Sequence, residues 1–415
     1  MKKLTPAEEA LIEAFEGRGE ASAEAQAAMT RLRATGLPTR RVEAWHYTDL
    51  RQHLKNVPPL AGRADEGNAE TLAKSDKTAI EAASVPVLDG HVFTELAEDA
   101  PEGVTLSRSE RVLTSDIPNE NTIGLMGQAL GGDCLDITVA DGASVDTPIG
   151  IGHLASDQAQ LATSQHDVHI GAKASATIIE RYTGGDGTAY QNTAVTNLSV
   201  GPGADAKYLI VFQNGDAATH LGQINVSIEA DAKLTLFVVN AGGRFCRQDL
   251  NVKVAGEGSE FILRGVNLIG DDQHIDLTMD LNHAVPHTTS EEIIRNVVVG
   301  NGKGVFQGMI RVAQIAQKTD AQMACNTLLL SDDGDFSAKP ELEIFADDVA
   351  CGHGATFADI EPSYMFYLMS RGIPEREARA ILIKGFVDEV VEDLDDEALE
   401  EAMIAIIDAW LDDHA

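Results

Sequence analysis

A cysteine and a histidine separated by one glycine are the strongest indication of chemistry in this sequence. Cys351, Gly352 and His353 follow two acidic residues, Asp347 and Asp348. On an extended segment, side chains two positions apart point to the same side of the chain. Thiolate and imidazole both bind transition metals, but two ligands do not complete a tetrahedral site. The spacing alone therefore leaves two interpretations open, part of a metal site or two packing residues.

Motifs for several other chemistries are missing from the sequence. It contains no glycine-rich loop ending in Gly-Lys-Ser/Thr, no Gly-x-Ser-x-Gly turn and no His-Glu-x-x-His pair. We therefore expect no ATP site and no hydrolase activity. Histidines also gather at His274, His283 and His287, but Pro286 argues against a helix that would bring them to one face. We expect these histidines to be structural members of a polar ladder.

Composition restricts the partners and the compartment. The net charge is −35, with 66 acidic against 31 basic residues, so most of the surface repels a phosphate backbone. Aromatic residues make up only 5% of the chain, which argues against a stacking groove for sugars or bases. No apolar run approaches the ~20 residues of a membrane span, and the N-terminus is charged at once. The four cysteines form no CxxC motif, which is typical of free thiols. We expect a cytoplasmic protein that binds neither nucleic acid nor membranes.

The elements that must position the Cys351–His353 pair form a repeat. Short β-rich runs are interrupted by turns of small residues, and the first five turns begin about 26 to 31 residues apart, a spacing that indicates a solenoid. One coil cannot bury its inner face alone, so stacked coils share a core. Glycine and alanine at the corners let neighbouring coils approach. The pattern favours a β-helix over an antiparallel sandwich, in which turns recur about every 8–12 residues. The turns span residues 139–143, 170–174, 200–204, 228–232, 254–258 and 299–303.

Helical patterns flank this core on both sides. Thr5 and Pro6 are typical of a helix start, and Pro362 and Pro374 are placed to open C-terminal helices. Trp45 is expected to be a core anchor of the N-terminal unit. We therefore predict a mainly β chain with an N-terminal helical domain (1–56), a mixed linker region (57–130), a β-helix core (131–360) and a C-terminal helical domain (361–415). The Cys351–His353 pair then lies in the last turn of the β-helix.

Several short motifs also occur in a fixed order along the chain. They are EAWHYT at 43–48, RQDL at 247–250, QHID at 273–276, FQG at 306–308, KPELEI at 339–344, CGHGAT at 351–356 and GF at 385–386. This ordered set resembles the SufB/SufD family of iron–sulfur cluster assembly proteins. The first motif and the Cys-x-His form at Cys351 resemble its SufD branch. Gly352 and Ala350 depart from the commonest residues of that branch, but neither change removes a ligand atom.

The resemblance implies a fold and a role. The fold is a right-handed parallel β-helix with helical domains at both ends. The role is a non-catalytic scaffold that pairs with SufB through the β-helix and binds the ATPase SufC through its C-terminal helices, with contacts expected at Leu368, Ile381 and Phe386. His353, with Cys351 as a second ligand, is expected to bind iron or a nascent iron–sulfur cluster at the interface, with the other ligands on SufB.

Two alternatives to this interpretation remain open. One is a β-helix enzyme that acts on a polysaccharide, which requires exposed paired carboxylates along a groove. The other is a purely structural subunit in which Cys351 and His353 only pack. The sequence also leaves open whether the chain alone forms a homodimer.

Overall fold

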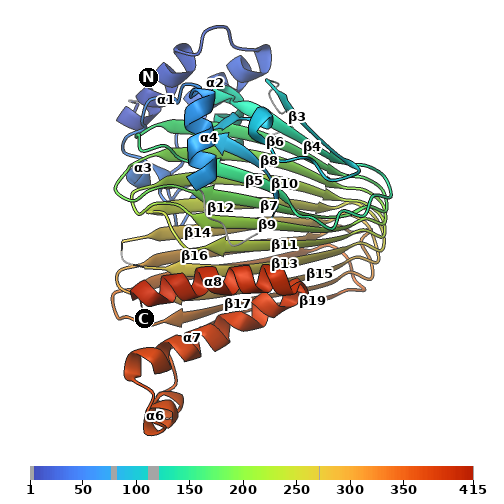
Figure 1. The fold of residues 1–415 in the computed structure, drawn as a ribbon. Helices are drawn as coiled ribbons and strands as arrows, with labels where there is room; N and C mark the ends of the chain where they lie inside the picture. The colour runs from blue at the N-terminus through green and yellow to red at the C-terminus, as the bar shows by residue number, and fades with distance from the viewer. Residues whose placement is uncertain (1–3, 76–81, 111–120, 271, 415) are drawn as a thin grey trace.

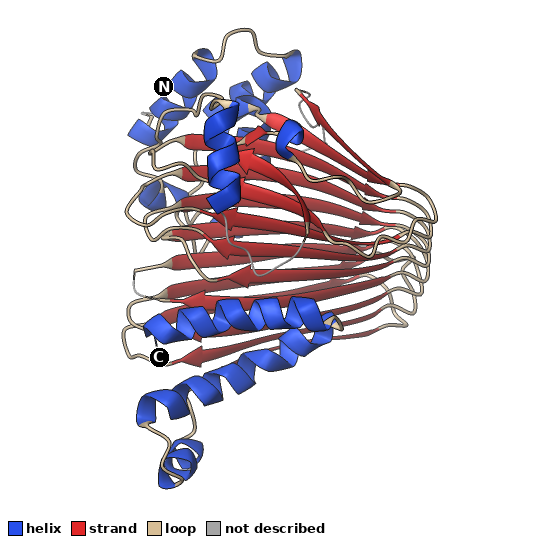
Figure 2. Ribbon diagram, in the orientation of Figure 1, coloured by secondary structure: helices blue, strands red, loops and turns tan. Residues whose placement is uncertain are grey.

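Two parallel β-sheets packed face to face form the body of the protein. The computed structural model describes residues 4–75, 82–110, 121–270 and 272–414. Within these residues, one sheet has the strand order β19-β17-β15-β13-β11-β9-β7-β5-β1-β2 and is called the odd-numbered sheet, because all its strands except β2 carry odd numbers. The other has the order β18-β16-β14-β12-β10-β8-β6-β4-β3 and is called the even-numbered sheet, because all its strands except β3 carry even numbers. The chain crosses from one sheet to the other at every turn. From β4 to β19 this makes eight stacked coils (Figures 1 and 2). The predicted parallel β-helix with flanking helices is confirmed.

The strands that build these coils are mostly nine or ten residues long. They are β4 (Asp133–Val139), β5 (Ile149–Leu154), β6 (Leu161–Ile170), β7 (Ser175–Thr183), β8 (Gln191–Val200), β9 (Asp205–Gln213), β10 (Thr219–Ile228), β11 (Lys233–Asn240), β12 (Phe245–Val254), β13 (Glu260–Ile269), β14 (His274–His283), β15 (Thr289–Val298), β16 (Lys303–Val312), β17 (Asp320–Leu329), β18 (Asp335–Ile344) and β19 (Ala350–Ala358). Equivalent residues of successive coils pair directly, for example Lys233 with Glu260 and Glu260 with Thr289.

The predicted turns are the corners of the coils. At Gly256 an added Cβ would lie 1.8 Å from the backbone nitrogen of Ala230, so only glycine lets these two coils approach so closely. Gly171 stands in the same relation to Asp141, where the Cβ would lie 2.6 Å from the backbone nitrogen. Each of the two glycines donates a backbone hydrogen bond to the preceding coil. The small residues at the corners therefore set the stacking distance.

The segment before the first full coil also joins the sheets. β1 (Ala83–Leu88) pairs in parallel with β5, while β2 (His91–Val92) and β3 (Val104–Ser109) pair antiparallel with β1 and β4. α4 (Glu66–Ser75) packs near β1, and η2 (Thr94–Leu96) follows β2. These elements lie in the predicted linker region 57–130. The boundaries between the four predicted domains stay a prediction.

The N-terminal helices lie against the outer face of the even-numbered sheet. The helices in this group are α1 (Pro6–Glu16), α2 (Ala23–Thr35), η1 (Glu43–Trp45), α3 (Leu50–His53) and α5 (Thr122–Leu130). They share an apolar cluster with Leu161, Leu221 and Phe245 of the sheet. Thr5 and Glu8 form a reciprocal capping box at the start of α1.

The C-terminal helices divide into a pair packed on the sheet and one that buries no residue. α7 (Glu375–Val391), η3 (Glu392–Leu394) and α8 (Glu397–His414) bury their apolar faces on the outer side of the odd-numbered sheet, against residues such as Leu209 and Phe237. α6 (Pro362–Ser370) buries no residue and projects past the last strands (Figure 1). Among the described helices, none combines the length and apolar character needed to cross a bilayer.

Candidate functional site

Cys351 and His353 lie on β19, the last strand of the odd-numbered sheet. They pair with Ala321 and Met323 of β17, and both of these residues are buried in the core between the sheets. Both side chains therefore lie on the same side of the strand, as the spacing predicts, and this side faces inward. Cys351 is half-buried against the core, whereas His353 is exposed. The pair occupies the open end of the solenoid interior.

His353 ends a column of inward-facing residues that runs through the odd-numbered sheet. The members of this His353 column occupy equivalent positions on successive strands: Ile149, Ile178, Tyr208, Leu236, Leu263, Glu292, Met323 and His353. The first seven members are buried. Only the last is exposed, because no further coil covers it in the described part of the chain.

The terminal coil also leaves strand edges and apolar side chains uncovered. β18 and β19 are the last strands of their sheets in the described residues. Ile344 is 39% exposed, Phe345 65% and Phe357 50%. Unpaired edges beside exposed apolar groups are a template for pairing with another chain.

The electrostatics at Cys351 bear on its chemistry. Burial raises the pKa of the thiol, and the nearby carboxylates of Asp320 and Glu292 raise it further. The sulfur is therefore protonated at neutral pH, and a metal that binds it must displace the proton. The other cysteines, Cys134, Cys246 and Cys325, are all buried, so Cys351 is the accessible thiol among the four.

The pair is an incomplete metal site by itself. Across the residues that the structure describes, no further His, Cys, Asp or Glu completes a group of three ligands with Cys351 and His353. The one such group is His153, His166 and Glu180, in the first coils. The sequence did not single out these three residues, because they are far apart along the chain.

The three predicted contact residues of the C-terminal helices lie in different environments. Ile381 is 48% exposed on α7, and Leu368 is half-buried on α6. Phe386 packs partly against the cluster under α7, with the Arg295 guanidinium 5.2 Å from its ring centroid. Exposed large apolar side chains are most frequent on α6, where Tyr364, Phe366, Tyr367 and Met369 are 44–75% exposed.

Several motifs of the sequence converge far from Cys351. Arg247 is buried on β12 and binds Asp276 at 2.7 Å and Asp249 at 2.9 Å. Its guanidinium lies 3.8 Å from the Trp45 ring and donates to the Ala44 carbonyl at 2.8 Å. Trp45 is 1% exposed, so the prediction of a core anchor is confirmed. These motifs attach the N-terminal segment to the even-numbered sheet.

The clustered histidines do not form a metal site together. The Nε2 atom of His274 lies 2.9 Å from the Thr48 hydroxyl, and burial lowers the pKa of His274 to about 3. His283 contacts Thr288 at 2.8 Å and Ser290 at 3.1 Å. His287 is exposed at a turn. The prediction of structural histidines is confirmed for His274 and His283.

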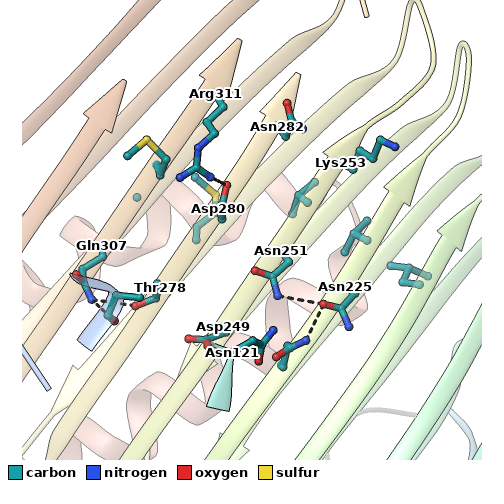
Figure 3. A pocket seen from close by; sticks show the side chains of 18 of the residues that line it. Asn121, Asn225, Asp249, Asn251, Lys253, Thr278, Asp280, Asn282, Gln307 and Arg311 are labelled. Atoms are coloured by element: carbon teal, nitrogen blue, oxygen red, sulfur yellow. Dashed lines mark hydrogen bonds and ion pairs between the residues drawn. The ribbon is translucent and has the colours of Figure 1, made fainter. Parts of the chain in front are cut away.

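A groove of about 780 Å³ runs along the outer face of the even-numbered sheet (Figure 3). Its floor carries an asparagine ladder in which Asn251 donates to Asn225 at 3.0 Å. Its carboxylates are engaged, since Asp280 pairs with Arg311 and Asp249 with Arg247. The one aromatic residue in its lining, Trp45, is buried. The groove thus lacks the free carboxylate pair and exposed aromatics expected of a polysaccharide-cleaving enzyme.

Comparison with known proteins gives a consistent result. Residues 153–386 match the family model described as SUF system FeS cluster assembly, SufBD core domain. The chain is 28% identical to the iron–sulfur cluster assembly protein SufD of Escherichia coli over 95% of this chain and 94% of that protein. It is 27% identical to the chloroplastic protein ABCI7 of Arabidopsis thaliana, covering 87% and 80% of the two chains. Identity to SufB of Bacillus subtilis is 22%, over 81% and 71%. The family model covers more than half of the sequence, and the chain belongs to the SufBD family of the SUF system for iron–sulfur cluster assembly.

Proposed function

We propose that this chain is a SufD-like scaffold subunit that completes a site for iron or a nascent iron–sulfur cluster together with a SufB-type partner. The observation that carries the proposal is the position of Cys351 and His353 at the uncovered end of the solenoid interior, beside unpaired strand edges. A site with two ligands on each chain binds its cargo only while the two chains are joined. Movement of the interface then releases the cargo.

The pairing surface in this proposal is the terminal coil. β18 and β19 offer their free edges to a strand of the partner, and exposed Phe345 and Phe357 supply apolar area beside them. A solenoid end without a capping repeat is stabilised by such a contact. The same surface is available to a second copy of this chain when the partner is missing.

The proposed ligands suit ferrous iron as cargo. Neutral imidazole and thiolate both bind Fe(II), and thiolate binds iron–sulfur clusters. Because the pKa of Cys351 is raised, the sulfur stays protonated until iron arrives, and binding releases one proton. His353 is the more accessible of the two and makes the first contact with the incoming ion.

The C-terminal helices provide the proposed contact with a SufC-type ATPase. α6 is apolar and none of its residues is buried within the described part of the chain, and Ile381 is an exposed apolar residue on α7. ATP is then hydrolysed by the partner, and this chain transmits the motion. Phe386 helps to fix α7 in place, because its side chain packs partly against the apolar cluster between α7 and the odd-numbered sheet.

Cluster assembly in the three-chain complex tests the terminal site. The complex with SufB and SufC is assembled anaerobically with wild type, His353→Ala or Cys351→Ser, and iron and sulfide per complex are measured. We expect His353→Ala to lose most of the cluster and Cys351→Ser to lose part of it. The matched control is His169→Ala, an exposed histidine on the outer face of β6. Full cluster content in an intact His353→Ala complex would falsify the proposal.

Binding of the ATPase is tested separately. Ile381→Ser combined with Phe366→Ser is expected to weaken SufC binding while leaving SufB pairing unchanged. Ile315→Ser, which alters a 68% exposed residue on a solenoid turn, is the control. Unchanged SufC binding by the double variant would exclude α6 and α7 as the contact.

A further inference from the structure

Three potential ligands from three strands meet inside the first coils. His153 on β5 and Glu180 on β7 come from the odd-numbered sheet, and His166 on β6 comes from the even-numbered sheet. The Nε2 atom of His153 lies 3.2 Å from Glu180 Oε1 and 3.2 Å from His166 Nε2, and the last two atoms are 3.8 Å apart. All three side chains are buried. The solenoid therefore encloses a compact triangle of two imidazole nitrogens and one carboxylate oxygen.

The dimensions of this triangle match those of a coordination sphere. Metal–nitrogen and metal–oxygen bonds of about 2.0–2.2 Å place neighbouring ligand atoms about 3–3.5 Å apart. Two of the three separations fall in this range, and the third exceeds it by a few tenths of an ångström. The three ligand atoms require only a small shift to bind one ion.

One hydrogen shared between the two imidazoles does not satisfy the three contacts. If His153 Nε2 carries hydrogen and donates to Glu180, the His166 lone pair faces the carboxylate. If His166 Nε2 carries it and donates to His153, the lone pair of His153 faces the carboxylate at 3.2 Å. Each placement leaves one buried polar contact unmatched, which costs free energy. A cation at the centre accepts all three lone pairs at once.

Contacts around the three side chains fix their orientation. Tyr182 donates to Glu180 Oε1 at 2.6 Å and Tyr208 to Oε2 at 2.7 Å, and Tyr182 also stacks on His153 with ring centroids 4.0 Å apart. Such outer contacts are usual around metal sites.

We propose that His153, His166 and Glu180 bind one divalent transition-metal ion of the Fe(II)/Zn(II) class inside the first coils. Two histidines and one carboxylate are a donor set for these two ions, and three protein ligands leave at least one position for a further ligand such as water. This site is distinct from the terminal Cys351–His353 pair. Its burial makes the ion a resident of the folded chain, in contrast to the cargo proposed for the open end.

Metal content of the full-length chain tests the proposal directly. The chain is produced in medium supplemented with iron or zinc, purified anaerobically, and its metal per chain is measured by mass spectrometry. We expect about one equivalent of one of these ions in wild type and a large loss in His166→Gln and Glu180→Gln. His283→Gln, which changes a buried histidine that contacts Thr288, is the control and retains the ion. The double variant Cys351→Ser, His353→Ala also retains it, and this result separates the internal site from the terminal one.

A measurement on wild type covers the case in which the buried variants fail to fold. Cobalt(II) incorporated into the wild-type chain is expected to give visible d–d bands without a thiolate-to-cobalt charge-transfer band, because all three ligands are nitrogen or oxygen. A charge-transfer band that disappears in Cys351→Ser would place the ion at the terminal pair and overturn the proposal. Metal-free wild type after supplementation, or full metal content in folded Glu180→Gln, would also overturn it.

Discussion

The two ends of the solenoid hold similar ligand types in opposite surroundings. At the N-terminal end β2 and β3 close the sheets by antiparallel pairing, and the first inward residues, such as Val85 and Ile137, are fully buried. At the C-terminal end β18 and β19 are the last strands of their sheets within the described residues, and Phe357 is 50% exposed. His153 and His166 are therefore buried within one chain, whereas His353 is exposed at the surface. The difference teaches that exposure of the coil, more than residue type, distinguishes the proposed resident site from the proposed shared one.

The largest expected effect on stability comes from a substitution in the middle of the His353 column. Leu236 and His353 occupy equivalent inward positions in the His353 column, four strands of the sheet apart. Leu236→Ala leaves a cavity and should lower the free energy of unfolding by about 2–5 kcal/mol. His353→Ala should change it by less than about 0.5 kcal/mol, because the side chain is exposed. Urea unfolding of the isolated chain measures both values. Equal losses would show that the terminal coil is packed as tightly as the middle.

A second prediction concerns Glu292, which lies two strands inward of His353 in the same column. Burial raises its pKa from 4.5 to about 8, although Ser290 and Arg264 partly oppose the shift. Between about pH 4.5 and 8, Glu292 is therefore protonated in the folded chain but ionised in the unfolded chain. The stability that this provides is complete below pH 4.5 and is lost as pH rises toward 8.

Glu292→Gln tests this directly, because glutamine does not titrate. Unfolding free energies of wild type and variant are compared at several pH values between about 5 and 8. As pH rises, the unfolding free energy of the variant should increase relative to that of wild type by about 1.4 kcal/mol per pH unit across the steepest part of this window. Parallel curves for the two proteins would show that Glu292 has an ordinary pKa and that the interior near the open end is already hydrated.

Much of the fold could be predicted from the sequence, because each coil repeats the same corner. Turns such as 170–174 and 200–204 recur at nearly one coil length, so the stacking followed from the spacing. β1 carries no such corner and contains Pro86, and its place in the odd-numbered sheet depends on pairing with β5. Long-range pairing of this kind leaves no local signal.

The two candidate sites differ in the same way. Cys351 and His353 are two positions apart on one strand, so their alignment was visible in the sequence. His153, His166 and Glu180 come from three strands and meet only because of the coil geometry. The one available signal was the 27-residue separation of His153 and Glu180, which is close to one coil length and predicts neighbouring strands. The inward direction of His166 from the opposite sheet could not be read from that spacing.

The last prediction concerns Phe357, at the open end of the solenoid. Phe357 and Phe212 occupy equivalent inward positions on β19 and β9, but Phe212 is fully buried whereas Phe357 is half exposed. Phe357→Ser should lower the unfolding free energy of the isolated chain by about 1 kcal/mol, because half of the side chain is already covered. The exposed half should contribute to pairing with a partner. Burying half of a phenylalanine contributes roughly 1 kcal/mol, so affinity for a SufB-type chain should fall about five- to tenfold.

Urea unfolding of the isolated chain and titration with the partner measure the stability and the affinity in this prediction. Ile315→Ser, at a more exposed residue on a turn, should leave both association and stability unchanged. If Phe357→Ser instead lowered stability by several kcal/mol with unaltered pairing, the terminal coil would have to be closed within one chain. His353 would then lie on a sealed surface, and a shared site at this end would be excluded.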